Sequence, residues 1–191
     1  MAHELDGRRV AILVTDGVEE VEYTEPRAAV EQAGARAELV SIKSGRIQAV
    51  QHQDKSNMYP VERTVDQAIP DDYDALLLPG GVANPDHLRT NPRAVAFVKA
   101  FFDAGKPVGA ICHGPWMLVE ADVVRGRTVT SWPSLRTDIR NAGGTWVDEP
   151  VDAENGLVTS RKPDDLPYFC AKVVEEFAEG RHRSFAGGTR R

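Results

Sequence analysis

Cys112 has the sequence setting that best suits chemistry. It follows an apolar run at residues 107–111, which predicts a short buried strand, and it precedes a run at 116–120 that predicts a helix. A cysteine on a sharp strand-to-helix turn is held clear of the sheet edge, as in a nucleophile elbow. The N–H groups and dipole of the helix are expected to stabilise its thiolate. An inert buried cysteine is the alternative, and the turn-forming residues Gly114 and Pro115 argue against it.

A pair of glycines suits the same chemistry. Gly80 and Gly81 follow an apolar run at residues 75–78. Because they lack a side chain, the backbone there can approach a ligand and aim an N–H group into the site. Together with the N–H of His113, the N–H of Gly81 would form an oxyanion hole. A tight turn with positive φ angles is the alternative, and it is compatible with this interpretation.

Four carboxylates lie just after the first apolar run, which covers residues 9–15. They are Glu19, Glu20, Glu22 and Glu25. For most of them we expect a solvated position that supports the start of a helix. A carboxyl group that points inward, beside a thiolate, would have a raised pKa and would hold a proton. Such a group can donate to the cysteine or carry a proton during the reaction.

The histidines exclude one familiar arrangement. A Cys–His–acid triad of the glutaminase type requires a histidine far downstream of the cysteine. Only His182 follows His113, and no acidic residue lies two positions after it. An imidazole in the reaction would therefore come from His113 or from His87. No group of His, Cys and carboxylate residues has the spacing of metal ligands, and no glycine-rich loop suits a phosphate, so we expect neither a metal nor another cofactor.

Strand-like and helical runs alternate along the chain. The first predicted helix has Thr24 as its N-cap and Pro26 in its first turn, and it ends at Gly34. Residues 43–67 are polar and predict a small hairpin. The alternation predicts an α/β fold with a mostly parallel sheet and helices on both faces, in which the carboxyl ends of the strands gather the site residues. The predicted strands lie at 9–15, 37–41, 75–78, 107–111 and 157–160, and the further helices at 92–104 and 165–179.

Length and composition fit one soluble enzyme domain. The chain has 191 residues, 41% of them hydrophobic, and a net charge of 23 − 29 = −6. We expect a single domain at 9–179, an N-terminal extension at 1–8 and a basic, disordered tail at 180–191. No apolar run of about 18 residues occurs, and the charge gives no sign of nucleic-acid or membrane binding. The two cysteines, Cys112 and Cys170, do not make a disulfide framework, which indicates a cytoplasmic location.

Five motifs, at residues 16–22, 78–81, 110–115, 130–132 and 160–166, together carry a resemblance to a known family. The chain resembles the PfpI-type intracellular protease family of the class I glutaminase-like superfamily, which includes the DJ-type proteins, from about residue 9 to residue 177. The resemblance implies a flavodoxin-like fold and a homodimer or higher homo-oligomer.

The resemblance also assigns catalytic residues by position. Cys112 matches the family nucleophile, and Glu22 matches the glutamate that hydrogen-bonds to it. His113 matches the adjacent histidine. Asp86 lies where some relatives supply a glutamate to that histidine across a subunit interface.

The activities that this family implies leave several functions open. They comprise peptidase, glyoxalase and deglycase activities, together with chaperone and oxidative-stress roles. The leading interpretation is a cofactor-independent cysteine enzyme that protects against small reactive carbonyl compounds in a stress response. The first alternative is an intracellular cysteine peptidase that acts on peptides. The second is a non-enzymatic peroxide sensor or chaperone that uses Cys112.

Overall fold

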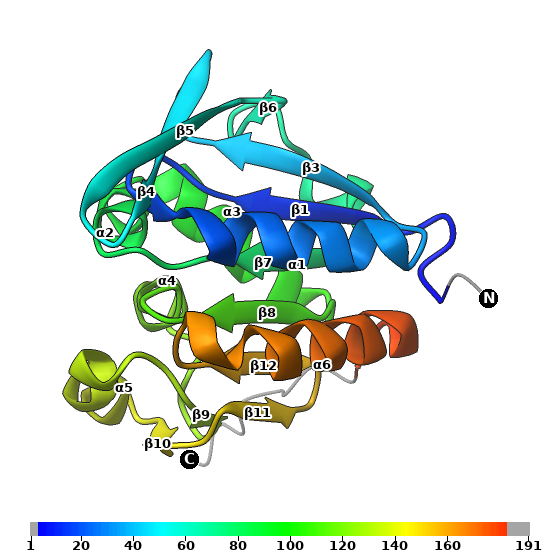
Figure 1. The fold of residues 1–191 in the computed structure, drawn as a ribbon. Coiled ribbons are helices and arrows are strands. Elements are labelled where there is room, and N and C mark those ends of the chain that lie inside the picture. Colours follow the sequence, from blue (N-terminus) through cyan, green and yellow to red (C-terminus); the bar gives the residue numbers. More distant parts are fainter. Residues whose placement is uncertain (1–3, 183–191) are drawn as a thin grey trace.

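A seven-stranded sheet forms the centre of the molecule, with helices on both of its faces (Figure 1). The computed structural model describes residues 4–182. Every neighbouring pair in the sheet is parallel except β11 with β12. The predicted α/β fold with a mostly parallel sheet is confirmed. In spatial order the strands are β11 (Val151–Glu154), β12 (Leu157–Ser160), β8 (Val108–Ile111), β7 (Ala75–Leu78), β1 (Arg9–Leu13), β3 (Arg36–Ser41) and β6 (Arg63–Thr64).

Two layers of helices bury the two faces of this sheet. Successive residues of β1 illustrate why, since Val10 and Ile12 face one apolar cluster while Ala11 and Leu13 face the other. A strand covered on both faces needs apolar side chains at consecutive positions. On one face, α1 (Glu20–Gln32) and α6 (Leu166–Glu179) lie side by side in Figure 1. The other face is covered by α2 (Ala83–Arg89), α3 (Pro92–Asp103) and α4 (Trp116–Glu120).

Smaller elements surround the central sheet. The polar segment at 43–67 forms the predicted hairpin, which adds to a short strand beside α1. The structure also contains short elements that no sequence pattern predicted, because a few residues do not establish a period. The hairpin sheet consists of β2 (Val18–Glu19), β4 (Arg46–Gln51) and β5 (Asp54–Pro60). The remaining short elements are β9 (Thr128–Val129), β10 (Thr145–Trp146), α5 (Arg136–Asn141) and the 3-10 turns η1 (Pro70–Asp72), η2 (Pro133–Leu135) and η3 (Pro163–Asp165).

The start of α1 differs from the prediction. The helix begins at Glu20, so Thr24 is not its N-cap, and the Thr24 hydroxyl instead donates to the Glu20 carbonyl at 3.0 Å. Pro26 lies inside the helix rather than in its first turn. The end of the helix was predicted correctly, since Gly34 follows the C-cap with a φ of 103°. The early start places Glu22 in the first helical turn, at the carboxyl edge of the sheet.

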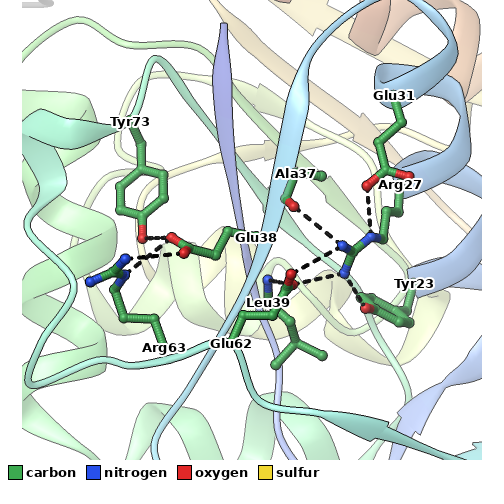
Figure 2. Close-up of polar contacts among 9 residues, drawn as sticks. All are labelled: Tyr23, Arg27, Glu31, Ala37, Glu38, Leu39, Glu62, Arg63 and Tyr73. Carbon is green, nitrogen blue, oxygen red and sulfur yellow. Dashed lines mark hydrogen bonds and ion pairs between the residues drawn. The ribbon is translucent and has the colours of Figure 1, made fainter.

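Polar contacts fasten α1 to the neighbouring strand (Figure 2). Glu62 accepts a hydrogen bond from the Leu39 N–H at 2.6 Å and pairs with Arg27 of α1 at 3.0 Å. Nearby, Glu38 of β3 accepts hydrogen bonds from Tyr73 and Arg63. The Glu62–Arg27 pair holds the helix that carries Glu22. The other groups that Arg27 contacts are the side chains of Glu31 and Tyr23 and the carbonyl oxygen of Ala37.

Both ends of the described chain pack on the domain. The Leu5 N–H donates to the Ala33 carbonyl at 2.8 Å, and the His182 N–H donates to the Gly105 carbonyl at 2.8 Å. Residues 183–191, which make up most of the predicted tail, lie outside the described residues. Between residues 4 and 182, no helix is long and apolar enough to cross a membrane.

Candidate active site

Cys112 lies on a sharp turn directly after β8. Its φ of 62° falls in the left-handed region, which non-glycine residues rarely adopt. The turn closes with a hydrogen bond of 2.8 Å from the Gly114 N–H to the Ile111 carbonyl, and the Cys112 N–H donates to Ser160 on β12 at 3.0 Å. This confirms the predicted strand-to-helix turn. Strained backbone of this kind is typical of a nucleophile elbow.

Glycines allow three chain segments to meet at this turn. A Cβ atom on Gly80 would lie 2.5 Å from the Glu22 carboxyl and 2.7 Å from the Cys112 Cβ. A Cβ atom on Gly114 would lie 2.2 Å from the Leu78 carbonyl oxygen. Such distances are too short for real atoms. The loop after β7 and the elbow after β8 therefore approach Glu22 only because these two positions have no side chain.

Glu22 is the carboxylate that points inward. It is 0% exposed, and its Oε2 accepts a hydrogen bond from the Gly80 N–H at 2.8 Å. The carboxyl group faces the Cys112 thiol closely enough to affect its titration. Burial raises the pKa of Glu22 to about 8, because a charged carboxylate loses its hydration there. Glu22 therefore holds a proton at neutral pH.

The neighbouring carboxylates have other roles. Glu20 accepts hydrogen bonds from Ser56 and Tyr59 of the hairpin, and these bonds lower its pKa to about 2. Glu19 accepts a hydrogen bond of 2.9 Å from the His52 N–H at the hairpin tip. Glu25 is exposed. The expected solvated position therefore holds for Glu25 alone and is wrong for Glu19 and Glu20, which the hairpin buries.

The titration of Cys112 differs from the prediction. The thiol is 7% exposed, and its burial, together with the adjacent charge of Glu22, raises its pKa rather than lowering it. The following helix α4 has only five residues, so its dipole does not offset this cost. The N–H groups of His113 and Gly81 act in the opposite sense and favour the thiolate. Because the two acids repel when both are charged, the thiolate coexists with a protonated Glu22.

His113 is a neutral neighbour of the thiol. Its Nδ1 lies 3.2 Å from the Cys112 Sγ, and its ring stacks on Trp132. Burial lowers the pKa of His113 to about 4, since the imidazolium would lose its hydration. At pH 7 the imidazole is therefore uncharged, and Glu22 is the group that brings a proton to the site.

Other predicted residues lie away from the thiol. Asp86 and His87 are exposed on α2 and do not line the pocket above Cys112. Among residues 4–182, His113 makes no hydrogen bond to a carboxylate of its own chain. His182 lies at the opposite edge of the sheet, beside Gly105, which precedes β8.

A pocket of about 450 Å³ opens above the thiol. The structure adds lining residues that sequence reasoning missed. Lys162 could have been found, because it follows the carboxyl end of β12, but His52 and Gln53 reach the site through the hairpin and carry no local signal. The pocket is lined by Glu19, Glu22, His52, Gln53, Gly81, Val82, Cys112, His113, Trp132, Lys162, Pro163 and Asp164.

Three relatives are similar to this chain along almost their whole length. Protein/nucleic acid deglycase 2 of Escherichia coli K12 is 40% identical over 87% of this chain and 96% of that protein. General stress protein 18 of Bacillus subtilis is 43% identical over 85% of this chain and 94% of the relative. YraA of the same organism, which its name describes as a candidate cysteine protease, is 40% identical over 85% of this chain and 94% of that protein.

Solved structures and a family model agree with these similarities. Schizosaccharomyces pombe DJ-1 has a TM-score of 0.78 and 25% identity, over 88% of this chain and 90% of that chain. A two-domain protein from Anabaena variabilis, with DJ-1/ThiJ/PfpI-like and ferritin-like domains, has a TM-score of 0.82 and 32% identity, over 88% of this chain and 47% of that one. The model of the DJ-1/PfpI family matches residues 8–176. The chain therefore belongs to the DJ-1/PfpI family.

Proposed function

We propose that this protein is a cysteine enzyme that acts on small reactive carbonyl compounds, of the glyoxalase or deglycase type, in protection against stress. The observation that carries this proposal is the buried pair of Cys112 and Glu22 at the base of an open pocket, with a proton on the carboxyl group at neutral pH. The names of two relatives, a deglycase and a general stress protein, support the same function.

The first step joins the thiol to the substrate. Because its pKa is raised, Cys112 is a thiol at neutral pH; its proton passes to water in the pocket as the sulfur attacks the aldehyde carbon of a 2-oxoaldehyde and forms a C–S bond. The N–H groups of Gly81 and His113, which face the sulfur, would stabilise the developing oxyanion. Protonated Glu22 then gives its proton to that oxygen. The product is a neutral hemithioacetal beside a carboxylate.

The next steps move a proton and release the acid. The Glu22 carboxylate takes the proton from the former aldehyde carbon and returns it to the neighbouring carbon through an enediol, while the hydroxyl proton on the first carbon passes to the oxygen of the second. This leaves a 2-hydroxy acid bound to Cys112 as a thioester. Water cleaves the C–S bond, which releases the acid and restores the thiol. The net reaction adds one water and needs no external oxidant or reductant.

Parallel assays with three reagents test this function. The protein is incubated with methylglyoxal, with a fluorogenic peptide and with hydrogen peroxide, and Cys112→Ser serves as the control. We expect turnover of methylglyoxal to lactate by the unmodified chain alone. If the protein cleaves the peptide and forms no lactate, the peptidase function replaces this proposal. Conversion of Cys112 to a sulfinate without any turnover would replace it with the sensor.

The peptidase is the weaker candidate on physical grounds. Amide cleavage needs an acid that protonates the leaving amine, and His113 is neutral with a pKa of about 4. The downstream His182 lies at the far edge of the sheet. A partner subunit that brings Asp86 to His113 would improve this chemistry.

The two free cysteines support a reducing, cytoplasmic location as a further part of the proposal.

We also expect the protein to form homo-oligomers with a shared site. Asp86 is exposed on α2, so it can act on His113 only from another copy. Light scattering should give a mass above the 20.9 kDa of one chain. Mixing inactive Cys112→Ala with impaired Asp86→Ala should restore activity to about a quarter of the original, because mixed dimers contain one intact site. A monomer, or a mixture without restored activity, contradicts the shared site.

A further inference from the structure

Three metal-ligating side chains meet at the end of α6 that lies farthest from Cys112. They are Glu176, Glu179 and His182. The last turn of α6 lies at the amino ends of β8 and β12, opposite the candidate active site (Figure 1). The sequence spacing did not predict this group. Two of the residues are a helical i, i+3 pair, whereas the third joins them only after the chain has turned.

Glycines set the position of His182. The chain reverses after α6 at Gly180, whose φ of 81° and ψ of −136° are accessible in practice only to glycine. The His182 N–H then donates to the Gly105 carbonyl at 2.8 Å. The His182 ring lies directly over Gly156, where a Cβ atom would come within 2.7 Å of it. The backbone thus fixes the ring over the end of the helix.

The spacing of the three ligand atoms matches a small metal ion. His182 Nε2 lies 3.3 Å from Glu176 Oε2 and 3.8 Å from Glu179 Oε2. All three atoms lie within 4.8 Å of one another. Ligands at 2.0–2.1 Å around a tetrahedral ion are separated by about 3.3 Å. The two separations from His182 lie within about 0.5 Å of this value, and the exposed Glu179 side chain would move inward to close the third.

Two of these atoms are buried and lack a hydrogen bond. Glu176 is 9% exposed, and its Oε2 and His182 Nε2 are both shielded from water; among residues 4–182 they have no hydrogen-bond partner apart from the 3.3 Å contact between them. Unsatisfied polar atoms in such positions are costly. A protonated His182 would form an ion pair with Glu176, which is the competing explanation. The guanidinium of Arg8, close to Gly180, pairs with Asp74 instead.

We propose that Glu176, Glu179 and His182 form a binding site for a divalent transition-metal ion of the Zn²⁺ type. One imidazole with two carboxylates suits Zn²⁺ better than the all-oxygen sites of Mg²⁺ and Ca²⁺. The carbonyl end of a 14-residue helix also favours a cation. Three protein ligands leave the fourth position to water. The ion would fasten the segment after α6 to the sheet.

Zn²⁺ titration of the full chain tests this proposal. The measurements use a Cys112→Ser background, so that the active-site thiol does not bind the ion, and a chromophoric chelator as competitor. We expect one Zn²⁺ per chain, and about 100-fold weaker binding in Glu176→Gln, Glu179→Gln and His182→Ala. His87→Ala, which removes an exposed histidine on α2, should bind as before. The Glu179 change is on the surface and should leave folding intact.

A spectroscopic readout separates the metal site from the ion pair. In ¹⁵N-labelled protein, Zn²⁺ should shift the ring nitrogen signals of His182 and leave those of His87 in place. If Zn²⁺ leaves the His182 signals unchanged, or if His182→Ala binds Zn²⁺ as tightly as its parent, the metal site is wrong. His182 and Glu176 then form an ion pair only.

Discussion

Replacing Cys112 by alanine should lower kcat/KM for methylglyoxal by at least about 1,000-fold. The change removes the sulfur that forms the covalent bond, and no other described side chain in the pocket is a thiol or hydroxyl nucleophile. The strained φ of 62° is kept with a smaller side chain, so the fold should be maintained. Steady-state kinetics, with circular dichroism as the check on folding, measure this effect.

Cys170→Ala is the matched control. Cys170 lies on α6, outside the residues that line the pocket, and its burial raises its pKa to about 12. It should therefore contribute packing and no chemistry. We expect Cys170→Ala to keep its turnover within about twofold. A comparable loss in both variants would show that the Cys112 effect is structural.

Replacing Glu22 by glutamine should make the protein more stable at neutral pH and less active. Burial raises the pKa of Glu22 from 4.5 to about 8. Between these values the folded chain keeps a proton that the unfolded chain releases, so stability is complete below pH 4.5 and falls as the pH rises towards 8. Glutamine has the same shape without this titration. At pH 7 it should raise the free energy of unfolding by roughly 3 kcal/mol.

The pH dependence makes this prediction specific. Urea unfolding at several pH values should show the two proteins converging near pH 4.5 and separating as the pH rises to 8. Equal stability throughout would contradict the raised pKa. Glu20→Gln is the control on the same helix, because Glu20 accepts hydrogen bonds from the hairpin. It should lower stability by about 1–3 kcal/mol.

The same substitution tests the proton carrier. Glutamine at position 22 can still donate a hydrogen bond, but it cannot exchange a proton, so turnover of methylglyoxal should fall by about 100-fold or more. Alkylation of Cys112 by iodoacetamide should continue. Normal turnover in Glu22→Gln would remove Glu22 from the mechanism and make His113 the better candidate.

Local sequence patterns determined the framework of this protein. Apolar runs of strand length, alternating with helical runs, identified β1, β3, β7, β8 and β12, because each buried strand needs continuous apolar residues. The same patterns located Cys112 after a strand and before a helix. Chain order along a parallel sheet then placed the carboxyl ends at one edge, where Gly80, Gly81 and Glu22 do lie near the thiol.

Tertiary structure decided the charges of the site. Sequence reasoning gave the thiol a lowered pKa from the helix dipole, but α4 is short and the thiol is buried beside Glu22, so desolvation prevails. The neutral state of His113 and the inward direction of Glu22 also depend on burial by distant segments. His182, Glu176 and Glu179 come together only because Gly180 reverses the chain. Burial and turn geometry arise from contacts between segments far apart in the chain, and no local pattern encodes them.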